Sequence, residues 1–165
     1  MSRRAAVLAA VALLALPPRV HAGPLILLNA QYGAPMRASA GIGVLTSSDA
    51  RKGSPSVEER QMRSGLLVAG NVGNGGEQLA IGLGGIVTQG SYLRTYGFDL
   101  RGTVTRTRKS PREATPESTY GGVEAGLTLS LVRVSAGYAR RIPGASGSDR
   151  NTFTWSIGVQ LPLGW

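Results

Sequence analysis

Apolar and polar residues alternate with a period of two over the last fifteen residues of the chain, from Asn151 to Trp165. The odd positions from Phe153 onward are all aliphatic or aromatic, and the even positions from Thr152 onward are small or polar. A period of two is typical of a β-strand whose two faces meet different surroundings. Ten steps of roughly 3.3 Å from Trp155 to Trp165, at a tilt of about 40°, project to roughly 25 Å, the height of the apolar band of a membrane β-barrel.

The same alternation predicts strands along most of the mature chain. The predicted strands are 25–32, 36–45, 66–72, 79–87, 92–105, 123–129, 132–139 and 151–165. Turns or loops separate them at 33–35, 47–60, 74–75, 89–91, 106–117, 130–131 and 140–150. We therefore predict an all-β fold, a closed up-and-down antiparallel transmembrane barrel of about eight strands. The first segment is short, and the count falls to seven if it is only a lead-in.

Asn74-Gly75 is the strongest local hairpin signal in the chain. A two-residue type I′ turn at this point pairs Gly73 with Gly76. It also pairs Val68 with Ile81, so the apolar even positions of one strand face the apolar odd positions of the next. Turn chemistry and hydrophobic pattern therefore specify the same register.

The composition of the second face favours lipid over water around the barrel. That face is mostly Gly, Ser, Thr and Ala, in a chain with 24 glycines and 16% charged residues. Glycine weakens a water-exposed strand, whereas the interior of an eight-stranded barrel is only just wide enough for side chains. We predict that the small face lines the lumen and the apolar face meets lipid. The alternative is a secreted or periplasmic soluble β-barrel that binds a small apolar ligand.

The first 22 residues have the pattern of a secretory signal peptide. A short basic stretch precedes an apolar run of 12 residues from Ala5 to Leu16, and two prolines end the run. The alternative is an N-terminal membrane anchor, but a helix that crosses the bilayer needs about 20 residues. We therefore predict cleavage near Ala22 and a single outer-membrane β-barrel domain over 23–165.

Several charged residues fall on the small face, and we predict that they form an ion-pair network inside the barrel. Isolated buried charges would be costly, so Glu124 is expected to pair with Arg133 or with Arg101. The alternative is that these residues lie near strand ends in solvent. The candidates are Arg37, Arg63, Asp99, Arg101, Glu124 and Arg133.

Basic residues gather in two of the predicted loops. Without the three arginines of the signal peptide, the 18 basic residues of the chain fall to 15 against 9 acids, a net charge of +6. Arginine pairs well with phosphate, so these loops are predicted to contact anionic lipid or lipopolysaccharide, with a solvated polar cap as the alternative. The candidates are Arg106, Arg108, Lys109, Arg112, Arg140, Arg141 and Arg150.

Aromatic residues near the predicted strand ends are expected to lie at the membrane interface, as in aromatic belts. They are Tyr92, Tyr120, Tyr138, Phe153, Trp155 and Trp165.

The sequence offers little for catalysis. It has no Cys, and its only His, His21, lies in the predicted signal peptide. The mature chain therefore lacks a thiolate and the usual general base near neutral pH. We predict a non-enzymatic protein without cofactor, metal or nucleic-acid partner. A lipid A-modifying barrel enzyme is a third hypothesis, because Asp99, Glu124 and several Ser are present.

The signal peptide, the amphipathic pattern over Leu25–Trp165 and the ending from Val159 to Trp165 together resemble the small eight-stranded outer-membrane barrels, of the kind formed by OmpX and the membrane domain of OmpA. The resemblance implies a location in the outer membrane of a Gram-negative bacterium and a structural or surface-binding role as a monomer. It also implies that the barrel-insertion machinery recognises the terminal aromatic residue. Most members end on Phe, so Trp165 departs from their pattern.

Overall fold

A computed structural model describes residues 24–47, 51–52, 60–89, 91–142 and 151–163. The predicted signal peptide, Arg150 and Trp165 lie outside these ranges. Within them the chain forms nine β-strands: β1 (Leu25–Ala34), β2 (Arg37–Ser47), β3 (Arg51–Lys52), β4 (Arg60–Gly73), β5 (Gly76–Gln89), β6 (Ser91–Thr107), β7 (Thr119–Leu129), β8 (Val132–Arg141) and β9 (Asn151–Leu163). No helix in the described part of the chain is long and apolar enough to span a membrane.

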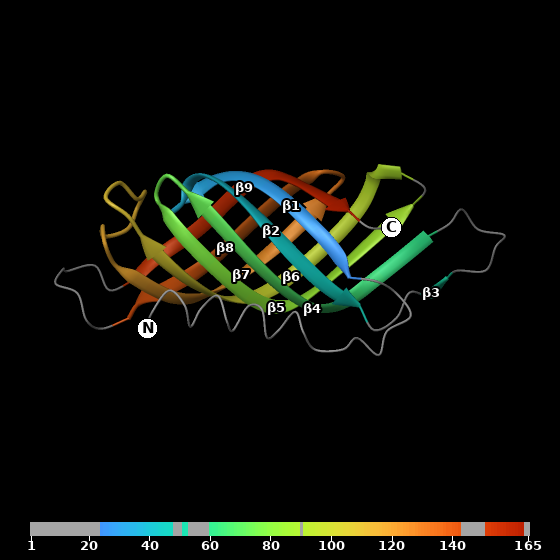
Figure 1. Ribbon diagram of the computed structural model, residues 1–165, viewed down its shortest axis with the longest axis horizontal. Coiled ribbons are helices and arrows are strands. Elements are labelled where there is room, and N and C mark those ends of the chain that lie inside the picture. The colour runs from blue at the N-terminus through green and yellow to red at the C-terminus, as the bar shows by residue number, and fades with distance from the viewer. Residues whose placement is uncertain (1–23, 48–50, 53–59, 90, 143–150, 164–165) are drawn as a thin grey trace.

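Eight of these strands close into an antiparallel up-and-down barrel (Figure 1). Consecutive long strands pair with each other, and β1 pairs with β9. Strand β2 pairs directly with β4, although the short β3 lies between them in sequence. Strand β3 only extends the edge of β4 at one end, where Arg51 is paired with Met62. The prediction of an eight-stranded barrel is confirmed, and the first segment is a full strand with partners on both sides.

Two predicted connections have the expected geometry. Gly73 pairs with Gly76 around the Asn74-Gly75 turn, and Val68 pairs with Ile81, which confirms the predicted register. Leu129 pairs with Val132, so the connection at 130–131 is a two-residue turn. No Gly marks this turn, and Ser130 itself takes the left-handed backbone conformation, with φ of 56°.

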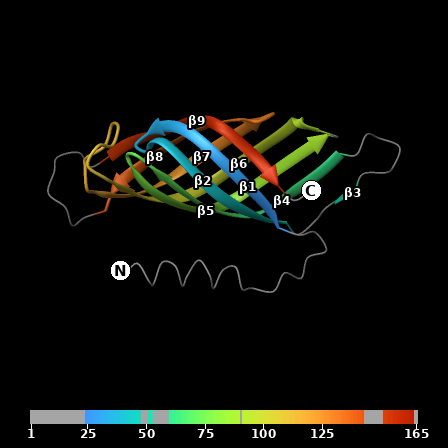
Figure 2. The same ribbon diagram turned by 45° about the horizontal axis from the view of Figure 1, so that its top comes forward.

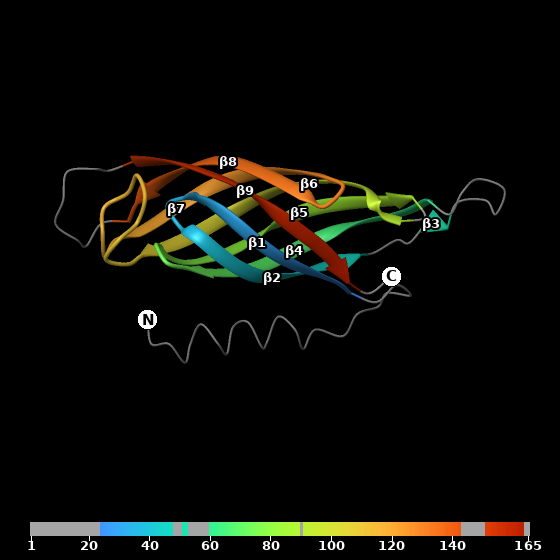
Figure 3. The same ribbon diagram turned by 90° about the horizontal axis from the view of Figure 1, so that it is seen from above.

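The strands wind around the barrel with a constant stagger. The path of paired residues that leaves β1 at Leu25 passes through Leu45, Leu67, Gly82 and Arg101. It continues through Glu124, Gly137 and Thr154, and the β9 to β1 register then returns it to the level of Pro35. A stagger of ten residues over eight strands corresponds to a tilt of about 40°, and the oblique strands are visible in Figures 2 and 3.

The two ends of the barrel differ in their connections. One end holds the start of β1, the end of β9, the 130–131 turn and the link from β2 to β4. We call this the terminal end. The other end, called the loop end, holds the turns at 35–36 and 74–75 and the loop 108–118, gold in Figure 1. Strand β8 ends and β9 begins at the loop end, so Arg106 and Arg140 lie on the same side of the barrel, and most of the predicted loop 140–150 lies outside the described residues.

The outward face is mostly apolar, as the alternation predicts, and the inward face is mostly small or polar except for large apolar residues toward the terminal end. Outward Leu83 and Leu100 are 66% and 64% exposed, and Ile157 and Val159 of β9 are also exposed. Between the last two, Gly158 points inward and is closely surrounded by β1. Met36 differs from its prediction, since it lies in the 35–36 turn and is buried rather than outward on a strand.

Candidate functional site

The lumen contains three successive layers of side chains. At the terminal end, five apolar side chains point inward and form a compact cluster, which we call the leucine plug: Leu25, Leu27, Leu45, Leu67 and Ile86. The three leucines at 25, 45 and 67 are successive partners in the sheet register, so the plug follows the stagger across adjacent strands. This layer is an apolar cluster toward the terminal end, where Arg63, Thr88 and Thr95 are also buried.

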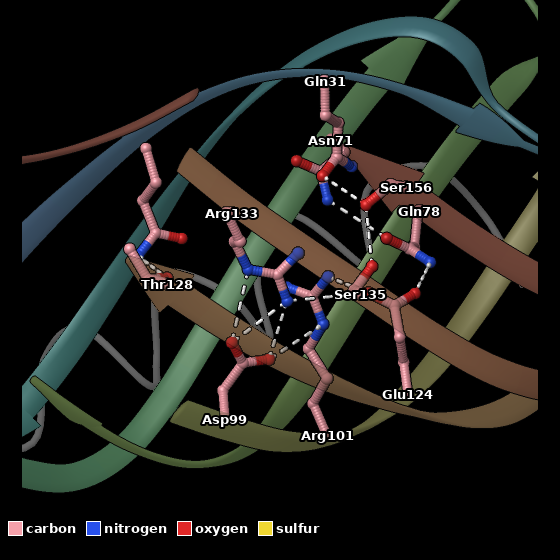
Figure 4. Close-up of polar contacts among 11 residues, drawn as sticks. Gln31, Asn71, Gln78, Asp99, Arg101, Glu124, Thr128, Arg133, Ser135 and Ser156 are labelled. Carbon is pink, nitrogen blue, oxygen red and sulfur yellow. Dashed lines mark hydrogen bonds and ion pairs between the residues drawn. The ribbon is translucent and has the colours of Figure 1, made fainter. Parts of the chain in front are cut away.

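Four charged side chains form the middle layer, which we call the ion-pair cluster: Asp99, Arg101, Glu124 and Arg133 (Figure 4). Arg133 Nη2 lies 2.8 Å from Asp99 Oδ1 and 3.7 Å from Glu124 Oε1. Arg101 forms an ion pair with Glu124, and its Nε lies 3.6 Å from Asp99 Oδ1. Two arginines and two carboxylates make the cluster formally neutral, and all four side chains are at least nine-tenths buried. Mutual pairing is what makes such burial tolerable.

Amides and hydroxyls extend this cluster toward the loop end. Gln78 Nε2 donates to Glu124 Oε2 at 3.4 Å, and Asn71 Nδ2 donates to Gln78 Oε1 at 3.1 Å. On the opposite wall, Ser135 and Ser156 share a hydrogen bond of 2.7 Å. Ser156 also donates to the side-chain oxygen of Gln31 (Figure 4). The polar lumen is therefore cross-linked between strands that are far apart in sequence.

The loop 108–118 folds across the mouth of the barrel at the loop end. Its backbone donates to the 74–75 turn, from Arg108 N to Gly75 O, and to the 35–36 turn, from Arg112 N to Pro35 O. Thr152 of β9 donates to the carbonyl oxygen of Glu113 at 2.6 Å. Because these contacts reach turns and strands on different sides of the mouth, the loop covers the third layer of the lumen.

That third layer consists mainly of threonines and one tyrosine. Tyr120 is 1% exposed, and its hydroxyl accepts a hydrogen bond from Thr115 N of the covering loop. Thr107 donates to the carbonyl oxygens of Thr115 and Ser118. The hydroxyls thus hold the loop from below, which completes the filling of the lumen.

Arg112 ties the same loop to the outer wall. Its guanidinium lies 5.7 Å from the ring centre of Tyr32 and 5.2 Å from that of Trp155. It donates to the Tyr32 hydroxyl at 2.9 Å and to Glu113 Oε1 at 3.1 Å. The hydrogen bonds to Glu113 and then Tyr32 raise the pKa of Arg112 above its ordinary value. The cation therefore stays charged and seated on two aromatic rings.

The structure separates the predicted interior charges into three groups. Asp99, Arg101, Glu124 and Arg133 come together, and Glu124 contacts both arginines proposed as its partners. Arg63 is also buried, but its position on β4, opposite Ile86, is nearer the terminal end than the ion-pair cluster is. Arg37 is a correction: it occupies the inward phase but is exposed, because it lies at the rim immediately after the 35–36 turn.

Two further predictions are wrong, because the residues concerned lie on the inward side of their strands. Tyr120 was expected at the membrane interface, but it lies on the inward phase of β7 and is buried in the lumen. Arg141 was expected to face anionic lipid, but it points inward from β8 and is 8% exposed. Both residues lie near strand ends, where the pattern alone leaves the phase uncertain.

The remaining residues that were predicted to contact the membrane either point outward or lie outside the part of the chain that the structure describes. Tyr138 and Phe153 are exposed on the outer wall, and Trp155 is half-buried beside Tyr32. Arg106, Arg108, Lys109, Arg112 and Arg140 are exposed at the loop end. The side chain of Tyr92 is not among those described.

Three features escaped the sequence-based prediction. They are the leucine plug, the Asn71–Gln78 amide pair and the Ser135–Ser156–Gln31 chain. All of these residues occupy inward positions of their strands, so the alternation along each strand indicated that their side chains point into the lumen. Their mutual contacts depend on the stagger between strands, which the pattern does not specify.

Neither family models nor curated proteins nor solved structures give a match to this chain. No relative therefore assigns a role to the ion-pair cluster or to the basic residues at the loop end.

Proposed function

We propose that this protein is a non-enzymatic outer-membrane β-barrel that spans the bilayer with a filled lumen and serves a structural, membrane-stabilising or surface-binding role. One observation carries the proposal: the barrel has charges inside and hydrocarbon outside. The buried ion-pair cluster occupies the lumen while residues such as Leu83 and Leu100 are almost two-thirds exposed on the wall. A water-soluble protein of this size rarely exposes contiguous apolar surface beyond a few hundred Å², whereas this arrangement suits a barrel in lipid.

The height of the outer apolar surface supports the same proposal. On β6 the outward positions are apolar or Gly from Tyr96 to Val104, and a charged residue, Arg106, follows. The eight residue steps from Tyr96 to Val104, at roughly 3.3 Å and a tilt of about 40°, span about 20 Å of axial height, and the twelve steps between the flanking Arg94 and Arg106 span about 30 Å. The hydrocarbon-facing band of an outer-membrane barrel is about 25 Å tall.

The filled lumen argues for a structural role over a transport role. The leucine plug, the ion-pair cluster and the threonine layer under loop 108–118 occupy successive heights of an already narrow barrel. The Ser135 and Ser156 hydroxyls share a hydrogen bond, Ser156 also donates to the side-chain oxygen of Gln31, and the Glu124 carboxylate is held by two arginines. These contacts cross-link the lumen between strands that are far apart in sequence, which favours a structural role.

An arginine scan by depth tests this proposal in the full chain, expressed in a Gram-negative host. We expect the wild-type protein in the outer-membrane fraction, with faster gel migration before boiling than after. Leu100→Arg lies near mid-height and is expected to reduce folded barrel strongly, because Arg at the bilayer centre costs roughly 2–4 kcal/mol. Val104→Arg, nearer the edge of the band, is the matched control and is expected to fold nearly as well.

A purified mature chain that is soluble and monomeric without detergent would overturn the proposal in favour of a soluble ligand-binding barrel. Equal folding of the Leu100→Arg and Val104→Arg variants would contradict it too. Steady conductance of the wild-type protein in a planar bilayer would contradict the filled lumen while leaving membrane insertion intact. Hydrolysis or acyl transfer on lipid A would instead support the enzyme hypothesis.

A further inference from the structure

Two arginines stand on the outer wall at the loop end and take no part in the ion pairs of the barrel. Arg106 on β6 and Arg140 on β8 both point away from the lumen and are exposed. Within the part of the chain that the structure describes, neither forms an ion pair. Nearby Arg108 differs, since its Nη2 lies 3.6 Å from Glu77 Oε2. Among the described residues, the two wall arginines are therefore cations without an acidic partner.

Both arginines mark the edge of the outer apolar wall that is nearest the loop end. The outward positions that precede Arg106 on its strand are Tyr96, Phe98, Leu100, Gly102 and Val104. Those that precede Arg140 are Val132, Val134, Ala136 and Tyr138. In each strand the first charged outward side chain after the apolar run is an arginine. A cation at this depth meets the headgroups of the surrounding lipid rather than its acyl chains.

The register places the two arginines side by side at one height. Arg106 pairs with Thr119 of β7, and Arg140 pairs with Gly121, two residues further along the same strand. Because the strands are tilted, the line of paired residues rises toward the loop end from β6 to β8. This rise offsets the two-residue step back along the strand. Strand spacing, rise and tilt then put the two Cα atoms about 11 Å apart at nearly equal depth. Two long side chains at this separation can converge on one anionic group.

The neighbouring groups include one acid, one apolar side chain, and the register partners Thr119 of Arg106 and Asn151 of Arg140. Glu77 pairs directly with Arg106 in the register, but its carboxylate lies near Arg108. The Ile142 side chain covers Gly121, whose Cβ, if present, would lie 3.6 Å from Ile142 Cδ1. An anion between the arginines would therefore lie beside the Ile142 side chain, with Glu77 as a competing charge.

We propose that Arg106 and Arg140 together bind one phosphate group of an anionic lipid in the surrounding leaflet, while its acyl chains lie on the apolar wall below. The inference rests on the proposed membrane location. Guanidinium groups form short, bidentate hydrogen bonds with phosphate, and the adjoining wall supplies hydrocarbon contact that a free phosphate ion would not use. The site thus selects a phosphate attached to an acyl anchor, such as the phosphorylated glucosamine of lipopolysaccharide.

The test uses the folded protein in zwitterionic micelles, titrated with bisphosphorylated lipid A and followed by native mass spectrometry. We expect saturable binding at one site, and binding roughly 30-fold weaker in the R106Q/R140Q variant. The matched control K109Q/R112Q removes the same charge from the same end but leaves the wall pair intact, and it is expected to bind like wild type. Glu77→Gln removes the competing acid and is expected to tighten binding.

Dephosphorylated lipid A and inorganic phosphate separate the sources of the anion. We expect both to bind at least tenfold more weakly than bisphosphorylated lipid A. Equal loss in the two double variants would reduce the effect to general charge and overturn the proposal, as would unchanged binding in R106Q/R140Q. Heat-dependent gel migration of each variant reports folding. A folded, membrane-inserted variant with unchanged binding rejects only the lipid site, whereas a water-soluble wild type rejects the membrane location itself.

Discussion

Arg133 on β8 reaches Asp99 on β6 across the intervening strand, with Arg133 Nη2 2.8 Å from Asp99 Oδ1. The β7 residue beneath this ion pair is Gly126, which pairs with Asp99 on one side and with Ser135 on the other. A Cβ at position 126 would overlap both Arg133 Nη2 and Asp99 Oδ2. The central ion pair of the lumen therefore depends on a position without a side chain.

Gly126→Ala is expected to destabilise the barrel by about 1–3 kcal/mol, because the ends of the Asp99 and Arg133 side chains must shift to admit the added methyl group. The measurement is the urea midpoint of the folded band in micelles. Gly102→Ala is the matched control on the outer wall, where an added Cβ would meet its nearest atom at 3.7 Å. Similar midpoints for the two variants would contradict this role for Gly126.

The ion-pair cluster should behave as a coupled unit. Asp99→Asn and Arg133→Gln each leave an opposite charge in the lumen with fewer partners, so each is expected to lower the free energy of unfolding by about 3–5 kcal/mol. The double variant removes both charges and is expected to lose clearly less than the sum of the two. Additive losses in the double-mutant cycle would mean that the two side chains act independently.

The leucine plug should respond to truncation more strongly than the outer wall. Leu45 is 1% exposed inside the lumen, whereas Leu83 is 66% exposed outside. Leu45→Ala leaves a cavity in a fixed frame and is expected to cost about 2–5 kcal/mol. Leu83→Ala is expected to cost less in micelles, because detergent chains fill the vacated space. A larger loss for Leu83→Ala than for Leu45→Ala would contradict the conclusion that the tightly packed side chains are those inside the lumen.

Arg112→Gln should loosen the loop 108–118. The variant removes a cation that lies 5.2 Å from the Trp155 ring centre and a hydrogen bond to Tyr32. We expect a change in Trp155 emission, faster proteinase K cleavage within the loop, and a stability loss of only about 0.5–1 kcal/mol. Lys109→Gln, an exposed cation of the same loop, is the control and should leave all three measurements unchanged.

Most of the strand pattern could be predicted because it depends on local signals. The Asn74-Gly75 turn and the period-two alternation specified the register between β4 and β5, and the structure has that register. The outward phase of Ile157 and Val159 was predictable for the same reason. Predictions failed near strand ends. Strands β7 and β8 extend beyond the predicted 123–129 and 132–139, so Tyr120 and Arg141 fall on the inward face, whereas Arg37 lies at the rim immediately after a turn.

By itself the sequence determined, for most positions within the strands, which side chains lie inside and which outside, because a strand alternates its faces and each face here has its own composition. It also determined the order of the strands, through the turns that join them. Only the tertiary structure decided which inward residues meet. The stagger of the closed barrel brings Asp99 to Arg133 over Gly126 and joins Leu25 to Leu45 and Leu67. That stagger is a property of closure around all the strands, and no single segment of sequence specifies it.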